Sequence, residues 1–451
     1  MTYDAQQDRV IGAVERSLTR LIPGWPEARL CVALSGGVDS VTLLAACVDI
    51  RSRRGRPALR AAHVHHGLQP EADAWQAHCE ALCGDRRIPL EVVRVAIDLR
   101  PGASPEAAAR DARYRALQGL LAPGEFLLTA HHLDDQLETV LLQLCRGAGV
   151  AGLSAMPPVA ALGRAWCLRP MLGLTRRDIE DHARRAGLAW VEDPMNAATR
   201  FDRSLLRHEV TPVLRARWPA IARSVAQSAG HLAESRELLD EIAAGDAVSL
   251  VDDGRVDIAR LLALSRPRQA NFLRWWLRQR GLGIPSRARL AAILNQVLPA
   301  RADARPLVRW SGGEVRRYRG RLYAMRPLDR VSEGSWAMAP GQVLDIAGVG
   351  RVTLAAATGR GVSRQRCPGP FELRLRRGGE RLRPAGHAIT KTVKRLLQEA
   401  GTEPWLRERM PLLYARDRLL MVGDRWVAAE TAAGPGEPGL VLAWTGADTA
   451  D

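Results

Sequence analysis

The sequence predicts an α/β protein that begins with a doubly wound parallel sheet. Three observations support this fold class. A short apolar run at residues 30–34 is followed by a loop of small residues and then by an apolar helical segment at 41–48. Further apolar runs alternate with helical segments as far as residue 129, which is typical of strand–helix–strand units. Polar residues follow several of these runs directly, as expected where parallel strands end at a shared rim.

The loop between the first strand and its helix is the expected nucleotide site. Free backbone N–H groups and the helix dipole attract anions at such a helix start, and glycines let the backbone approach a ligand. The loop is not a Walker P-loop, because it has no lysine after its last glycine. An acidic residue among phosphates needs a cation, so we expect Mg²⁺ near Asp39. The residues assigned to ATP are Ser35, Gly36, Gly37, Val38, Asp39 and Ser40.

This loop resembles the SGGxDS loop of the PP-loop ATP pyrophosphatases, which release pyrophosphate and adenylate their substrates. A purely structural Gly-Ser turn is the alternative interpretation.

The other elements of the first domain, expected at 1–218, follow in chain order. We expect helices at 10–22, 72–85, 105–121 and 176–186, the last capped by Thr175, and strands at 59–65, 90–95, 126–129 and 164–169. Alternation places His63 and His65 on one face where the second strand ends. We assign His63 to the ATP site, and a pair of ordinary strand-end histidines is the alternative.

An acidic cluster follows the fourth expected strand. Asp134 and Asp135 lie at a helix start, where the dipole stabilises carboxylates, and Glu138 lies one turn after Asp134 on the same face. Together with His132, these residues are candidates to bind Mg²⁺ or an ammonium group. A capped helix with solvated acids is the alternative.

Composition favours a polyanionic partner. The net charge is +16 over 451 residues and the pI is about 10.6, which in a globular protein points most simply to nucleic acid. A solvated basic surface is the alternative. The seven cysteines are scattered and odd in number, which argues against a disulfide framework. Because the sequence has no membrane-spanning run and no signal-peptide core, we expect a soluble, cytoplasmic protein without a membrane partner.

The chain after residue 218 is expected to form three further parts. We predict a mostly helical domain at 219–330, a linker region with short strands at 331–370, and a small α+β domain at 371–445. Trp275 and Trp276 lie on an Arg-rich helix expected at 266–280, where they either stack on RNA or belong to the core. The only two lysines, Lys391 and Lys394, are expected on one face of a helix at 390–400, where they would bind a phosphate backbone.

Several motifs resemble the tRNA(Ile)-lysidine synthetase family of the PP-loop superfamily. They are His63-Val-His-His-Gly-Leu68, Asp73-Ala-Trp75, Ala109-Arg-Asp-Ala-Arg-Tyr114, His132-Leu-Asp-Asp-Gln-Leu-Glu-Thr139, Gly152-Leu-Ser-Ala-Met156, Glu192-Asp-Pro-Met-Asn196, and Asp202-Arg203 with Leu206-Arg207. The match runs in register to about residue 218 and continues more weakly to Thr402-Glu-Pro-Trp-Leu-Arg407. Ser204 and Met195 depart from the residues usual in the family, Asn and Ser.

The resemblance implies an ATP-dependent ligase that joins free L-lysine to C2 of the wobble cytidine in the CAU anticodon of tRNA(Ile). An adenylated cytidine is the implied intermediate, and the lysidine product pairs with A instead of G. Asp39, Arg113 and Arg207 are the implied catalytic residues, and Arg203, Arg381, Lys391 and Lys394 are assigned to tRNA. A homodimer is a possible assembly.

Two other functions remain open from the sequence. A tRNA thiolase of the same superfamily would need a reactive cysteine pair, and Cys79 and Cys83 are the only close pair. A non-catalytic RNA-binding protein with a relic nucleotide fold is the other alternative, against which the intact Ser35–Ser40 loop argues.

Overall fold

The computed structural model describes residues 8–67, 70–96, 105–192, 201–301, 304–331 and 334–446. The motif residues Leu68 and 193–196 lie outside these ranges. The chain divides into two compact units, Met1–Leu238 and Leu239–Asp451, and each is described by itself.

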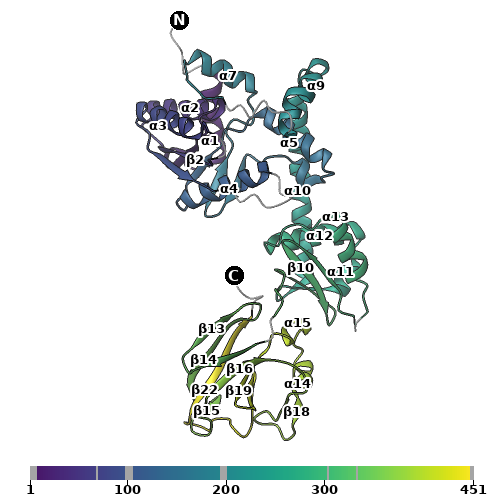
Figure 1. Cartoon of the computed structure of the whole chain (residues 1–451). Helices are drawn as coiled ribbons and strands as arrows, with labels where there is room; N and C mark the ends of the chain where they lie inside the picture. Colours follow the sequence, from purple (N-terminus) through teal and green to yellow (C-terminus); the bar gives the residue numbers. More distant parts are fainter. Residues whose placement is uncertain are drawn as a thin grey trace. The chain divides into compact units, whose positions relative to one another are not determined.

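The first unit, which runs from purple to teal in Figure 1, contains a six-stranded sheet. The order of its strands is β3-β2-β1-β4-β6-β5. Its strands are β1 Arg29–Ala33, β2 Ala58–His65, β3 Leu90–Arg94, β4 Phe126–Leu128, β5 Val159–Leu162 and β6 Ala165–Leu168. Neighbouring strands are parallel except for β5, which pairs antiparallel with β6. The predicted parallel sheet is therefore confirmed, with an antiparallel edge strand that the sequence did not indicate.

Helices α1 Arg9–Leu21, α2 Val38–Arg54, α3 Ala72–Asp85 and α7 Arg176–Arg185 cover one face of this sheet, and α4 Pro105–Leu120 covers the other. Further helical elements are α5 Leu133–Cys145, α6 Val150–Leu153, α8 Asp202–Leu205, a π-helical turn at Leu206–Val210, α9 Thr211–Arg217 and α10 Ile221–Leu250. One buried core joins the sheet to α1, α2, α3 and α7, while a second core packs α4 on the opposite face through Leu117. Because β1 lies between β2 and β4, the strand order reverses beside the loop that follows β1, which is where doubly wound sheets bind ligands.

The prediction of a mostly helical domain at 219–330 is wrong. This region contains an antiparallel sheet in the order β7-β8-β11-β10-β9. Its elements are β7 Val251–Asp252, β8 Arg255–Asp257, α11 Ile258–Ala263, α12 Arg266–Gln279, α13 Arg287–Ala292, a π-helical turn at Ile293–Val297, β9 Leu307–Trp310, β10 Gly313–Tyr318 and β11 Arg321–Met325. The strands are short, but Val315 and Leu322 are fully buried against the helices. Trp276 stacks on Phe272 in this core, so it serves packing.

The C-terminal part is built from two more antiparallel sheets, ordered β12-β16-β19-β20-β21 and β13-β14-β22-β15, and a two-stranded ribbon β17-β18. The elements are β12 Ser335–Met338, β13 Val343–Ile346, β14 Gly350–Thr358, β15 Val362–Ser363, β16 Phe371–Leu375, β17 Arg381–Leu382, β18 Lys391–Thr392, α14 Val393–Glu399, α15 Pro404–Arg407, β19 Pro411–Ala415, β20 Arg418–Val422, β21 Trp426–Val427 and β22 Pro438–Gly446. The segment expected as a linker supplies strands to both larger sheets, and β14 pairs with β22 along its whole length.

The ribbon corrects one detail of the sequence analysis. Lys391 lies on β18, and the helix begins only at Val393. Thr392 is the N-cap and accepts a hydrogen bond from the backbone N–H of Arg395, so it ends the extended segment. Lys391 and Lys394 therefore do not share a helix face. Among the described residues, no helix is long and apolar enough to cross a membrane.

Candidate active site

The loop after β1 is shaped by its two serines and two glycines. Ser40 Oγ lies 3.0 Å from Ser35 Oγ, accepts the Ser35 backbone N–H at 3.1 Å and donates to the Gly37 carbonyl at 3.0 Å. Gly36 has φ +88°, and a Cβ there would lie 3.0 Å from the Val191 side chain. Only glycine fits this position, because both the backbone conformation and the space exclude a side chain. The loop therefore presents backbone N–H groups at the start of the 17-residue helix α2.

His63 lies beside this loop, as the shared rim predicts. Its Nδ1 is 2.9 Å from the carbonyl oxygen of Leu34, the residue that precedes the loop. Burial lowers the pKa of His63, so the ring is neutral at physiological pH. Cys79 Sγ is 3.5 Å from the same Nδ1. His65 instead faces Asp73, with Nε2 3.1 Å from its carboxylate.

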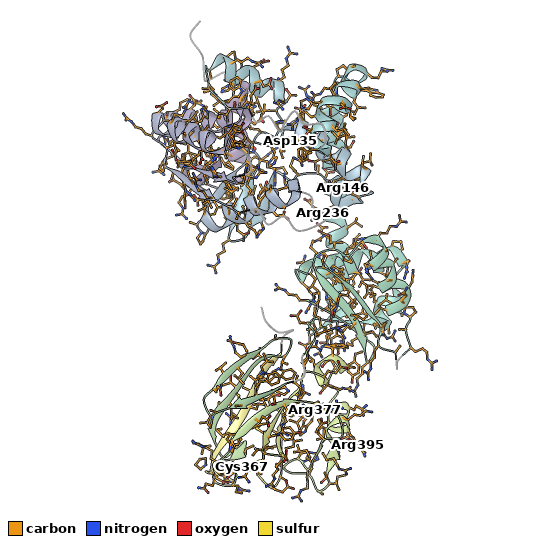
Figure 2. The ribbon with its side chains drawn as sticks, in the orientation of Figure 1. Asp135, Arg146, Arg236, Cys367, Arg377 and Arg395 are labelled. Carbon is orange, nitrogen blue, oxygen red and sulfur yellow. The ribbon has the colours of Figure 1, made fainter. Side chains whose placement is uncertain are left out.

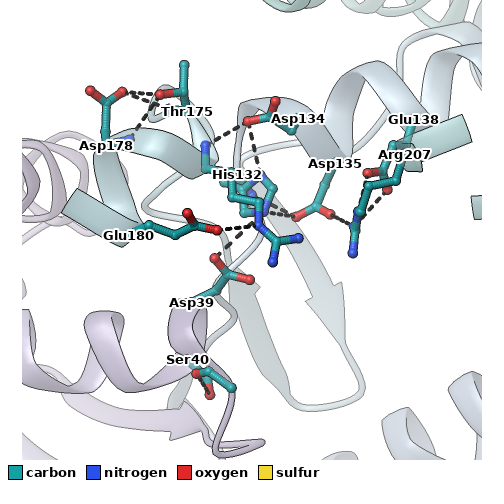
Figure 3. Close-up of polar contacts among 12 residues, drawn as sticks. Asp39, Ser40, His132, Asp134, Asp135, Glu138, Thr175, Asp178, Glu180 and Arg207 are labelled. Carbon is teal, nitrogen blue, oxygen red and sulfur yellow. Dashed lines mark hydrogen bonds and ion pairs between the residues drawn. The ribbon is translucent and has the colours of Figure 1, made fainter. Parts of the chain in front are cut away.

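Asp39 and His132 face each other across the rim (Figure 3). Asp39 Oδ1 lies 3.8 Å from His132 Nε2, is buried and has no hydrogen-bond partner. Burial raises the pKa of Asp39, and the charges of His132 and Arg176 oppose this only in part. A buried carboxylate oxygen without a hydrogen bond is costly, which indicates a site built to meet a cation or a cation-bound ligand.

The acids of the α5 cluster are held by groups from distant parts of the first unit. Asp134 accepts the Arg176 backbone N–H at 2.7 Å and pairs with Arg215. Asp135 accepts the His132 backbone N–H at 3.0 Å and closes a capping box. Burial opposes ionisation of Asp135, but the charge of His132 and this N–H donor outweigh it, so the pKa of Asp135 lies below its usual value.

Arg207 joins two of these acids. Its Nε and Nη2 donate to the two oxygens of Glu138 at 2.7 and 3.0 Å, and Nη2 lies 3.5 Å from Asp135 Oδ1. Glu138 is only 2% exposed, so this bidentate pair is largely shielded from water. The sequence placed these residues at one rim but did not indicate that Arg207 would bind both carboxylate oxygens of Glu138.

Three arginines surround His131, next to the acidic cluster of α5. Burial lowers the pKa of His131 to about 3. The charge of Asp135 opposes this shift in part, and the charges of Arg169, Arg110 and Arg113 add to it. His131 Nδ1 is 2.9 Å from Thr129 Oγ1, and Arg169 is 7% exposed at the end of β6. The sequence analysis missed Arg169, although its position directly after a strand is the signal that identified the other rim residues. Arg215 carried no such signal.

The residues assigned to tRNA fall in two separate places. Arg203 lies on α8 and donates to Thr139 at 3.3 Å in the first unit. Arg381 and Lys391 lie on the paired strands β17 and β18, and Lys394 is exposed on α14. Lys391 Nζ is 2.7 Å from Glu399, so much of its charge is already neutralised.

Neither metal chelation by the protein alone nor thiol chemistry is supported. The described residues contain no group of three or more His, Cys, Asp or Glu side chains placed to hold a metal ion. Cys79 and Cys83 are buried, and burial raises the pKa of these thiols to about 12 and about 11. Reactive cysteines need the opposite shift.

Comparison with known proteins agrees with this geometry. Residues 12–214 match the family model described as PP-loop domain, 257–323 the TilS substrate binding domain and 371–444 the TilS substrate C-terminal domain. The tRNA(Ile)-lysidine synthase of Methylococcus capsulatus is 42% identical over 427 residues, which cover 93% of this chain and 97% of that protein. The chain belongs to the tRNA(Ile)-lysidine synthase family.

A second tRNA(Ile)-lysidine synthase, from Pseudomonas aeruginosa, is 40% identical over 96% of this chain and 97% of its own. Among solved structures, the U34-tRNA thiolase NcsA from Methanococcus maripaludis covers 52% of this chain and 81% of its own with 17% identity and a TM-score of 0.44. Like other tRNA(Ile)-lysidine synthases, the chain is an ATP-dependent PP-loop ligase that binds tRNA.

Proposed function

We propose that the first unit carries out both half-reactions of lysidine formation at the rim between Asp39 and Glu138. The C2 oxygen of the wobble cytidine of the CAU anticodon attacks the α-phosphorus of ATP, and pyrophosphate leaves. An amine of free L-lysine then attacks C2, AMP leaves with the former C2 oxygen, and the amine loses a proton. The buried Oδ1 of Asp39, which lacks a hydrogen bond and lies beside the phosphate loop, is the observation that carries this proposal.

The loop supports the first half-reaction. Its backbone N–H groups and the start of α2 suit the β- and γ-phosphates, so pyrophosphate is held as it leaves. Adenylation turns the C2 oxygen, a poor leaving group, into part of AMP, a good one. Arg113 and Arg207 are the proposed donors to charge that develops on the α-phosphate.

The donor set fits Mg²⁺ that enters with ATP. Mg²⁺ is usually bound through one or two carboxylates together with substrate phosphates, and rarely by a cage of protein ligands alone. Asp39, whose Oδ1 lacks a hydrogen bond, and the nearby Asp135 are the proposed carboxylates. When bound, the ion would neutralise charge on the phosphates and would remove the cost of an ionised Asp39.

The Arg207–Glu138 pair suggests how lysine binding is ordered. We assign Glu138 to an ammonium group of lysine, and Arg207 occupies both oxygens of this acid. We propose that Arg207 turns to the α-phosphate when ATP binds, and that Glu138 is thereby freed for lysine. Lysine should then bind measurably tighter in the presence of a non-hydrolysable ATP analogue, which isothermal titration tests. Equal affinity with and without the analogue contradicts this order.

Incubation with labelled lysine, ATP and unmodified tRNA(Ile) tests the function itself. Nucleoside analysis should find lysidine, and AMP and pyrophosphate should appear in equal amounts. Without lysine, adenylated tRNA should accumulate. If label never enters the tRNA, the proposal fails. We expect a cytoplasmic enzyme, and assembly as a homodimer remains a prediction that light scattering decides.

A further inference from the structure

The second unit contains a cavity of about 440 Å³ that no part of the proposed reaction uses. Its walls come from β9 and β10, from Leu328–Val331 and Gly334, and from the residues after β16 and α15. Six arginines line it: Arg309, Arg316, Arg330, Arg376, Arg377 and Arg409. Among the described residues of the lining, the acids are Asp329 and Glu408. The cavity is therefore strongly basic, and its volume falls in the range of ligand sites, about 300–1,000 Å³.

One wall is fixed by a single buried carboxylate. Glu314 is fully buried, and its two oxygens each hold one arginine, with Arg309 Nε at 2.8 Å and Arg316 Nε at 2.7 Å. Arg316 also stacks on the Trp405 ring at 5.2 Å. Both guanidinium groups are thus held in place while one carboxylate compensates only one of the two charges. Arginines fixed in this way lose little freedom when they bind an anion.

The remaining walls add four more arginines. Arg409 donates to the carbonyls of Trp405 and Asp329 at 2.9 and 2.6 Å. Arg376 lies 3.5 Å from Glu380. Arg330 and Arg377 are exposed, and Figure 2 labels Arg377 at the end of β16. Even with Glu314 and Glu380 counted, positive charge remains in excess.

We propose that this cavity is a phosphate subsite that binds backbone phosphates of the bound tRNA, at nucleotides other than the reacting one. Planar guanidinium groups match phosphate oxygens in pairs, and six of them exceed what one small monovalent anion needs. The lining residues belong to the two regions that match substrate-domain models, 257–323 and 371–444, and to the segment between them. This inference rests on the proposed tRNA substrate.

Exposed rim residues allow a test that leaves the buried wall intact. The double variant Arg330→Glu/Arg377→Glu should raise the Kd for unmodified tRNA(Ile) at least about tenfold, measured by filter binding. Each lost phosphate contact should also lower the slope of log Kd against log salt by about 1. The variant Arg330→Lys/Arg377→Lys keeps the charge and should restore the salt slope but only part of the affinity. Circular dichroism and thermal unfolding, measured in parallel, confirm that the variants are folded.

A matched control and a competing ligand sharpen the result. Arg360→Glu changes an exposed arginine on the β14–β15 connection and should alter the tRNA Kd less than about twofold. If the double variant binds tRNA with unchanged Kd and slope, or if the control weakens binding equally, the subsite is refuted. Tripolyphosphate that binds the wild type but not the double variant, with tRNA affinity unchanged, assigns the cavity to a free anion instead. Lysidine formation by the wild type, scored separately, shows whether the proposed function fails independently.

Discussion

The two basic regions of the molecule use arginine in opposite ways. In the first unit, Arg207 and Arg215 are paired with buried acids, and Asp39 Oδ1 is one of several buried polar atoms without a hydrogen bond. In the cavity of the second unit, arginines outnumber the acids around them. The first arrangement fixes charges for a reaction and the second holds positive charge ready for a polyanion. Substitutions in the first unit should therefore change the rate of lysidine formation and the stability of the protein. Substitutions in the cavity should change the affinity for tRNA and its salt dependence.

Asp39→Asn should have the largest effect. Activity should fall about a thousandfold, equivalent to ~4 kcal/mol of transition-state stabilisation, because the proposed contact to Mg²⁺ and phosphate is lost. Thermal stability should rise. Because burial raises the pKa of Asp39 in the folded protein above its ordinary value, the ionised form destabilises the fold, and this cost grows as pH rises from the unfolded pKa through the folded pKa.

Thermal unfolding from pH 4 to 8 without ATP measures this second effect. The difference in melting temperature between Asp39→Asn and the wild type should increase with pH and then level off. Each kcal/mol of difference in unfolding free energy should shift the melting temperature by about 2–4 °C. Addition of Mg²⁺ and ATP should close the gap, since only the wild type gains the full stabilisation from binding. A variant that is less stable than the wild type at pH 8 contradicts the assignment.

Glu138→Gln should be the most destabilising change at the rim. It leaves Arg207 without its bidentate partner in a site that is mostly shielded, and breaking such a pair costs about 3 kcal/mol. Urea unfolding measures the loss. Glu399→Gln is the matched control, because it removes an exposed partner of Lys391 and should leave stability unchanged. Equal effects of the two substitutions would show that the rim pair is no more protected than a surface pair.

The sequence was sufficient for features that are local in the chain. The loop at 35–40, the cap at Thr175, the strand end near His63 and the helix start at Asp134 follow from neighbouring residues and from the parallel topology. The sequence did not predict which charged side chains pair with each other. Arg207 binds Glu138, which lies 69 positions away in the chain, and no sequence pattern indicates this pair.

The antiparallel sheets were missed for a different physical reason. β7 has two residues and β8 three, which is too short for alternation to be visible. β14, with the sequence Gly-Arg-Val-Thr-Leu-Ala-Ala-Ala-Thr, has low strand propensity and was assigned to a linker, but pairing with all nine residues of β22 overrides this. Tertiary pairing thus decided what propensity could not.

The two lysines should differ in their effect on tRNA binding. Lys394 is exposed, whereas Lys391 is half-buried and paired with Glu399 at 2.7 Å. Lys394→Ala should raise the tRNA Kd about threefold to tenfold and lower the salt slope by about 1. Lys391→Ala should change the Kd less than about twofold. Filter binding at several salt concentrations measures both, and the reverse order would show that Lys391 leaves Glu399 for the RNA.

Replacing the buried cysteine pair should have the smallest effect on activity. Cys79 packs between His63 and the loop glycine Gly36, and Cys83 faces the core, so Cys79→Ala/Cys83→Ala removes packing and should cost about 1–2 kcal/mol of stability. Both thiols have a raised pKa, so neither is a nucleophile at neutral pH, and lysidine formation should stay within about twofold of the wild type below the melting temperature. Cys145→Ala, at an exposed position, should change neither quantity. Loss of activity in the double variant with ATP binding intact would place sulfur chemistry at the rim and reopen the thiolase alternative.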